Sequence, residues 1–143
     1  MSAPRFGAVI VNYNSAPLAV AAALSFLGDG GVAVAIVDNQ SADDSRLVLK
    51  AAREGRAPLF AAVAALAGTA VELVLAEQNG GFAAGCNIGL RRLLARGDCT
   101  HFLLLNPDAL VAAGSLDAFA ERLADPSVGL CGATVAAYDA PHR

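Results

Sequence analysis

The segment HFLLLNPDALV, residues 101–111, runs four apolar residues directly into the polar triplet Asn106-Pro107-Asp108. A short continuous apolar run bounded by turn residues predicts a buried strand, here over residues 100–106. Three earlier runs share this pattern, namely GAVIVNY (7–13), VAVAIVDN (32–39) and VELVLAE (71–77). Strands that are apolar on both sides are typical of parallel sheets covered by helices.

Helical patterns separate these runs. We expect helices over residues 18–27 (Ser15 as cap, Pro17 in the first turn), 41–55, 57–67, 81–97 (ending at Gly97) and 115–126 (Ser115 as cap, Pro126 as stop). The apolar run VGLCGATVAAY, residues 128–138, predicts a fifth strand. The sequence therefore predicts a single α/β domain over residues 1–143, with an open, mostly parallel sheet and helices on both faces.

The composition limits the function classes. The chain has 143 residues, 56% hydrophobic and 16% charged, with a formal net charge of -3. These values are typical of a packed globular domain, and without a basic run nucleic acid is not expected as the partner. The cysteines Cys86, Cys99 and Cys131 lack the spacing of a zinc site or a disulfide framework. The alanine-rich segment 57–76 nears membrane-spanning length, but it contains Glu72, and we expect no transmembrane segment.

Polar side chains follow all four apolar runs. The stretches are Asn12-Tyr13-Asn14, Asp38-Asn39-Gln40-Ser41, Glu77-Gln78-Asn79-Gly80-Gly81 and Asn106-Pro107-Asp108. Each stretch taken singly is ordinary turn chemistry. Ligands of open α/β sheets bind outside the carboxyl ends of the strands, so four such stretches on one rim favour a polar ligand pocket.

The common nucleotide-binding and hydrolase fingerprints are absent from the sequence. No GxGxxG follows the first strand, and neither GxxxxGK[ST] nor GxSxG occurs. Asp38 and Asp108 nevertheless follow apolar runs. A carboxylate there can accept a hydrogen bond from a base N–H or a ribose hydroxyl, or hold Mg²⁺ or Mn²⁺ together with substrate phosphates. For Asp108, a turn or helix-cap role is the alternative.

Glycine spacing marks the expected helix 81–97. Gly81, Gly85 and Gly89 are four residues apart and share one helical face. Glycine permits close approach either to a ligand or to the sheet, and the spacing fits both. Asn87 lies in the same helix although Asn is a poor helix former, which indicates a polar role near the rim.

Four segments together resemble the amino-terminal half of glycosyltransferase family 2, in particular its rhamnosyltransferase-like branch. They are VIVNYNS (9–15), IVDNQSADDS (36–45), EQNGGFAAGCNIGL (77–90) and FLLLNPDALV (102–111). The resemblance covers residues 6–138, and its last two segments are the most specific. It implies a GT-A fold, a Rossmann-like nucleotide-diphospho-sugar transferase domain, of which this chain is expected to be a truncated, donor-binding half.

The resemblance also implies the roles of individual residues. Tyr13 would lie near the nucleoside, Asp38 would bond uracil or thymine, and Asn106 would face the ribose or a phosphate. Asp108 would hold Mg²⁺ or Mn²⁺ at the DxD position of the family, where Asn106 replaces the first Asp. The implied nucleotide-binding residues are Asn12, Tyr13, Asp38, Asn79, Gly81, Asn87 and Asn106.

The implied activity is inverting transfer from a UDP- or dTDP-sugar to a polysaccharide, lipid or similar acceptor. The family's catalytic base is an Asp or Glu further along its chains, and Asp117, Asp125 and Asp139 do not match it. The alternatives are a nucleotide-binding module without turnover and a degenerate structural domain that forms homo-oligomers. The amino terminus lacks a signal-peptide pattern, so a cytoplasmic location is expected. The resemblance implies a peripheral position at the inner membrane face, where family members often act.

Overall fold

The computed structural model describes residues 3–54 and 70–137. Strands and helices alternate along them as the apolar runs predict. The elements are β1 (Phe6–Asn12), α1 (Ala16–Gly28), β2 (Ala33–Asp38), α2 (Ser45–Arg53), β3 (Val71–Leu75), α3 (Gly81–Arg96), β4 (His101–Leu105) and α4 (Ser115–Leu123). The α/β fold class is therefore confirmed.

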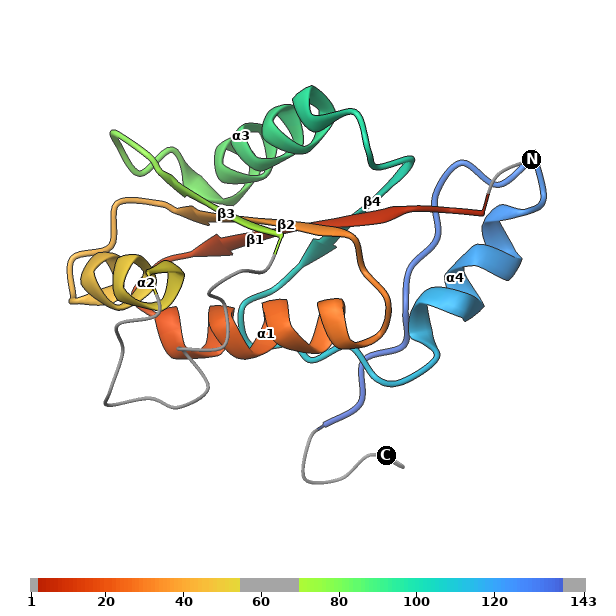
Figure 1. Cartoon of the computed structure of the whole chain (residues 1–143), viewed down its shortest axis with the longest axis horizontal. Helices are drawn as coiled ribbons and strands as arrows, with labels where there is room; N and C mark the ends of the chain where they lie inside the picture. The colour runs from red at the N-terminus through yellow and green to blue at the C-terminus, as the bar shows by residue number, and fades with distance from the viewer. Residues whose placement is uncertain (1–2, 55–69, 138–143) are drawn as a thin grey trace.

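The strands of the described residues form one parallel sheet in the order β3-β2-β1-β4. The helices α1 and α2 carry the chain from β1 to β2 and on to β3, on one face of the sheet. The helix α3 covers the other face and returns the chain past β1 to β4 (Figure 1). The direction of winding therefore reverses between β1 and β4, and this reversal makes a topological switch point.

The two central strands are buried throughout, which explains their continuous apolar sequence. Alternate side chains point to opposite faces, so Ile10 and Ile36 belong to the core against α1, and Val9 and Val37 to the core against α3. Polar residues within β1 or β2 would break one of these cores. The polar residues of these runs therefore stand only at the strand ends.

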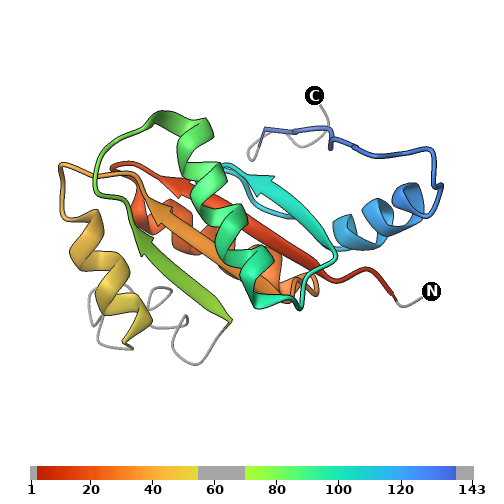
Figure 2. The same ribbon diagram turned by 90° about the horizontal axis from the view of Figure 1, so that it is seen from above.

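The glycines of α3 allow this helix to lie close on the sheet, which it crosses in Figure 2. A Cβ atom at Gly89 would lie 2.4 Å from Cγ1 of Val9, and one at Gly85 would lie 2.7 Å from Cγ1 of Val11. Of the two roles left open by the spacing, these two glycines therefore have the packing role. Gly81 differs, because it starts the helix with a φ of +81° and a Cβ atom there would meet nothing within 4 Å.

After β4 the chain turns back along α1 toward the opposite end of the sheet. The Val111 N–H donates to Oγ of Ser25 (3.0 Å), and the Gly114 and Leu116 N–H groups donate to the two carboxylate oxygens of Asp29 (2.6 and 2.8 Å). Asp29 lies between α1 and β2. The helix α4 therefore begins at the amino end of the sheet.

The expected fifth strand is wrong over its described part. Residues 128–137 form no strand beyond a single bridge at Ala137, and Leu130 and Val135 are 91% and 85% exposed. An apolar run becomes a strand only where a sheet edge pairs with its backbone, and Gly129 and Gly132 weaken this run further.

Several expected helix ends are also displaced. The helix α2 begins at Ser45 rather than at residue 41, and α4 follows a Gly114 cap and ends at Leu123, before Pro126. Ser15 is the cap residue of α1, but its hydroxyl donates to Oδ1 of Asn12 instead of capping the helix. The expected helix over 57–67 lies outside the described residues.

Candidate functional site

The carboxyl ends of the strands meet along one rim, as the sequence predicts. Asn12 of β1 is in register with Asp38 of β2, and Asp38 is in register with Leu75 of β3. On the other side Ile10 is in register with Leu105, so Asn106 leaves the sheet beside the end of β1. The four polar stretches therefore lie on the same rim, although their side chains are used very differently.

Asp38 is at the centre of a buried hydrogen-bond network and is fully inaccessible to solvent. Its Oδ1 accepts from the Ser41 N–H (3.1 Å) and from Nε of Arg46 (2.6 Å). Its Oδ2 accepts from the Ser41 hydroxyl (2.6 Å) and from Nδ2 of Asn12 (3.0 Å). Each carboxylate oxygen thus has two protein donors, which is about its full capacity.

The same contacts determine the ionisation of Asp38. Burial raises the pKa of its carboxyl, but the hydrogen bonds from Ser41, Arg46 and Asn12 outweigh burial and bring the pKa below its ordinary value of 3.8. Asp38 is therefore a carboxylate at neutral pH. Its charge is balanced inside the rim by the Arg46 guanidinium.

Arg46 was missed by the sequence analysis, and it connects two strand ends. Its Nε donates to Asp38, and its Nη2 donates to the carbonyl of Ala76, just after β3 (2.6 Å each). Arg46 is the second residue of α2, where the positive end of the helix dipole disfavours a cation. A basic residue at that position is the one sequence signal that points to a nearby carboxylate.

A second network joins the loops after β2 and β3. Nδ2 of Asn39 donates to Oδ1 of Asn79 (2.9 Å), and Oδ1 of Asn39 accepts from the Gly80 N–H (3.3 Å). Gln40, with a φ of +61°, bonds both the Glu77 carbonyl and the Asn79 N–H. The Asn79 oxygen also accepts from the Gly81 N–H (3.0 Å). Asn79 and Gly81, both expected at the site, are thus fixed by this network.

The side chains at the switch point are not used in this way. Tyr13 is 49% exposed, and Asn106 and Asp108 are exposed as well. Among the described residues none of these three side chains has a hydrogen-bond or ion-pair partner. The rim therefore has a closed part over β1 to β3 and an open part between the ends of β1 and β4.

Asn87 lies apart from these residues. Gly85 and Gly89 face the sheet, and Asn87, halfway between them at about 100° per residue, faces the opposite way and is exposed. The structure thus brings Asn12, Asp38 and Asn79 into networks and leaves Tyr13, Asn106 and Asp108 open at the rim. It does not bring Asn87 to the strand ends.

Residues 8–143 match the family model described as "Glycosyl transferase family 2". The chain belongs to glycosyltransferase family 2. A parallel sheet with helices on both faces is the architecture expected of a GT-A domain of such a glycosyltransferase. Comparison with curated proteins gave no match.

A divalent metal fits the open part of this glycosyltransferase rim only if a bound substrate supplies some of its ligands. The described residues contain no group of three or more His, Cys, Asp or Glu side chains able to hold a metal. The Asp108 carboxylate is exposed and has both oxygens available. Mg²⁺ is commonly bound by one or two carboxylates plus substrate phosphates, and Asp108 could supply one such carboxylate beside a phosphate-bearing substrate.

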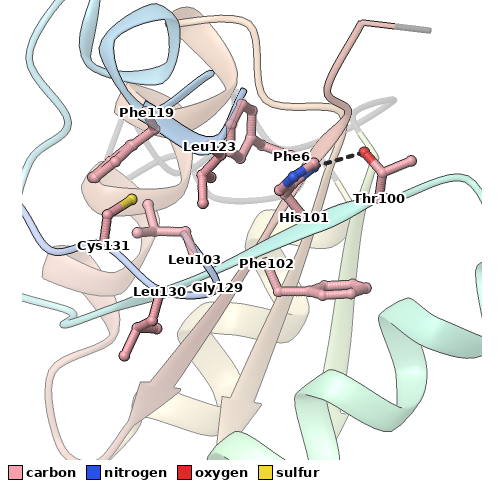
Figure 3. A pocket seen from close by; sticks show the side chains of 10 residues that line it. All are labelled: Phe6, Thr100, His101, Phe102, Leu103, Phe119, Leu123, Gly129, Leu130 and Cys131. Carbon is pink, nitrogen blue, oxygen red and sulfur yellow. Dashed lines mark hydrogen bonds between the residues drawn. The ribbon is translucent and has the colours of Figure 1, made fainter. Parts of the chain in front are cut away.

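Two surface hollows lie away from this open part. One, of about 270 Å³, is at the amino end of the sheet, where Phe6 and His101 begin β1 and β4, and Phe119 and Leu123 of α4 also line it (Figure 3). A shallower one, of about 580 Å³, flanks the end of β3 from Val74 to Gln78 and reaches Ile88 of α3. The first is lined mainly by apolar residues and lies at the opposite end of the strands from the switch point, and the second lies beside β3, so neither coincides with the open part of the rim.

In the described part of the glycosyltransferase, no helix has both the length and the apolar character needed to cross a membrane.

Proposed function

We propose that this glycosyltransferase binds a nucleotide-diphosphate-sugar at the switch point between β1 and β4, and that the bound sugar is then transferred to an acceptor hydroxyl. One observation carries the proposal. Tyr13, Asn106 and Asp108 are exposed and without partners among the described residues, whereas the neighbouring strand ends use their polar groups on one another. Polar groups kept available at a switch point are typical of a ligand site.

The nucleoside end is proposed to lie against the loops after β1 and β2. The Tyr13 ring offers a face for the nucleoside, and Asn12 holds the Asp38 carboxylate (3.0 Å). A direct bond from Asp38 to uracil or thymine requires it to release one of its present donors. Asn79 and Gly81 complete this side through the loop after β3. Asn87 would contact the donor only where the donor reaches over the outer face of α3.

The diphosphate end is proposed to lie at Asn106 and Asp108. The Asn106 amide can donate to a ribose hydroxyl or a phosphate oxygen, and Asp108 can hold Mg²⁺ or Mn²⁺ beside the diphosphate. A bound metal supplies positive charge that stabilises the departing nucleoside diphosphate. Within the chain itself, these two residues orient the donor so that its anomeric carbon faces the acceptor.

The finer assignments are proposals that rest on the sequence motifs. The transferred sugar is rhamnose or a related hexose from a UDP- or dTDP-donor, and the acceptor belongs to a bacterial cell-envelope polysaccharide or lipid. Transfer is inverting. A general base removes the acceptor proton, the acceptor oxygen bonds the anomeric carbon, and the bond from that carbon to the diphosphate oxygen breaks. Asp117 is unsuited as this base, because it lies in the first turn of α4 at the amino end of the sheet.

Location and assembly are proposed together. The chain works in the cytoplasm, peripherally at the inner membrane face. Homo-oligomers form through β4, which is an edge strand and pairs only with β1 among the described residues. Sedimentation of the chain, with and without lipid vesicles, tests both statements. A chain that stays monomeric and does not bind the vesicles at any concentration would reject both statements.

The donor proposal is tested by calorimetric titration with UDP and with dTDP, each with and without Mn²⁺. We expect metal-dependent binding of one nucleotide, and its loss by at least about tenfold in Asp108→Ala, since metal and phosphate ligation are then both weakened. The matched control is Asp117→Ala, which removes an exposed carboxylate at the opposite end of the sheet. It should bind like the wild type.

Two outcomes would reject the proposal. One is a folded wild-type chain that releases no heat with either nucleotide. The other is equal binding by wild type and Asp108→Ala, which would place the nucleotide elsewhere on the molecule.

A further inference from the structure

Arg46 stands where the loops of the rim come together. Its guanidinium bonds the last residue of β2 and the carbonyl that follows β3, both at 2.6 Å. The sheet ladder ends at the same place, with the Ala76 N–H donating to the Asp38 carbonyl (2.9 Å). The Arg46 guanidinium, whose N–H groups form a planar fork, therefore connects β2 and β3 beyond their last backbone hydrogen bond.

The consequences reach further along the loop after β3. Once Ala76 is held, the next residues bond the loop after β2, with Glu77 and Asn79 contacting Gln40 and with Gly80 contacting Asn39. This loop leads directly into α3 through Gly81. The Arg46 side chain on α2 thus fixes the start of the loop that contains Asn79 and Gly81.

Helix stability does not explain a cation at this position. Arg46 is in the first turn of α2, where the helix dipole repels positive charge, and its side chain stays 34% exposed. An Arg also differs from a Lys here, because only the planar fork reaches a carboxylate and a carbonyl at once.

We propose that Arg46 is a positioning residue of the donor site, which acts through Asp38 and Ala76 to preform the loop that receives the nucleotide. The proposal rests on the proposed function, because the loop matters for binding only if a nucleotide binds at this rim. If Arg46 had only a structural role, replacing it would lower the free energy of unfolding but would not change the nucleotide affinity of the folded protein.

The test measures folding, loop order and affinity separately in Arg46→Met and Arg46→Lys. Titrations with UDP and with dTDP, each with Mn²⁺, are run well below each unfolding temperature, so that both variants are folded. Hydrogen exchange of the Ala76–Gly81 amides in the free protein reports the loop without any nucleotide. The matched control is Arg92→Met on α3, which removes an Arg from a partly exposed ion pair with Glu72 of β3 (3.5 Å).

We expect Arg46→Met to weaken binding of the nucleotide that the wild type binds, UDP or dTDP, by at least about tenfold, as is usual when a supporting hydrogen bond of a site is lost. Exchange at Ala76–Gly81 should accelerate while that of β1 stays slow. Arg46→Lys should recover only part of both effects, because the ammonium cannot make both contacts well. Arg92→Met should match the wild type in affinity and in exchange of this loop.

Each contrary result has a distinct meaning. Unchanged affinity in folded Arg46→Met would overturn the positioning role, even if the protein is less stable. Full recovery by Arg46→Lys would overturn the requirement for the fork. A wild type that does not bind UDP or dTDP would reject the proposed function and with it this role, whatever the exchange data show.

Discussion

The two parts of the rim are alike in sequence and opposite in structure. At the end of β2, Asp38 is inaccessible and has four protein donors, whereas after β4 Asp108 is exposed and has no partner among the described residues. Both are carboxylates that follow an apolar run. The comparison shows that a polar residue at a strand end can either build the rim or serve a ligand. What separates the two is whether its hydrogen-bonding capacity is already occupied.

The largest expected effect is the difference in the free energy of unfolding between the alanine variants of the two carboxylates. Asp38→Ala leaves Asn12 and Ser41 without their buried acceptor and Arg46 without its counter-charge, and we expect a loss of about 3 kcal/mol in the free energy of unfolding. Asp108→Ala should change it by less than about 0.5 kcal/mol. Urea denaturation at neutral pH measures both, and equal losses would remove the distinction between the closed and open parts.

The same contrast applies to the two faces of α3. Gly89→Ala places a methyl group against Val9, where it would meet Cγ1 at 2.4 Å, and we expect a loss of about 2 kcal/mol from overpacking. Asn87→Ala, on the outer face, should be neutral or slightly stabilising because alanine is the better helix former. Thermal unfolding of the two variants tests this, and a harmless Gly89→Ala would mean that α3 does not need its close approach to the sheet.

A carboxylate at the other end of the sheet extends the comparison. Asp29 accepts hydrogen bonds from the Gly114 and Leu116 N–H groups and so caps α4 from a distant loop. We expect Asp29→Ala to lower the free energy of unfolding by about 1 kcal/mol, as is typical of a lost cap. Nucleotide affinity should not change, since this cap is far from the rim along the strands. Glu121→Ala, an exposed change on the same helix, is the control for a general effect of lost charge.

The smallest effect is a dependence of stability on pH. The folded-state pKa of Asp38 is below the ordinary value of 3.8, so its contribution is complete above that value and is lost as the pH falls through the folded-state pKa. We expect the stability difference between wild type and Asp38→Asn to be constant near neutral pH and to shrink below pH 3.8. Urea denaturation across that range would contradict this if the difference grew toward acid pH.

Local sequence patterns predicted the fold well wherever burial on both faces determines the residue types. The two central strands, β1 and β2, carry continuous apolar runs because helices cover both sides of the sheet there. The outer strands β3 and β4 are only half-buried, and β3 accommodates Glu72. The run at 128–138 has the same local pattern, yet its described part forms no strand beyond the single bridge at Ala137. Pairing depends on whether the rest of the fold places the run beside a sheet edge, and a local pattern contains no information about that placement.

The sequence predicted that the polar residues lie along one rim, but it did not predict that the rim divides into a closed part and an open part. Asn12 and Asp38 are 26 residues apart, and Asn39 and Asn79 are 40 apart, so their hydrogen bonds depend on how separate loops meet. Arg46 shows the same difficulty, because its role comes from contacts with Asp38 and Ala76 and not from a motif of its own. Family membership, in contrast, followed from the motifs and was confirmed by comparison.

The most direct test of the open part of the rim is an amide NMR titration of the chain with UDP and Mg²⁺. We expect the largest shift changes at Tyr13, Asn106 and Asp108, smaller ones along 76–81, and little change at the amino end of the sheet. The opposite pattern would contradict a donor site at the switch point. In that case the largest changes would fall at Phe6, Thr100 and His101, around the apolar hollow of Figure 3.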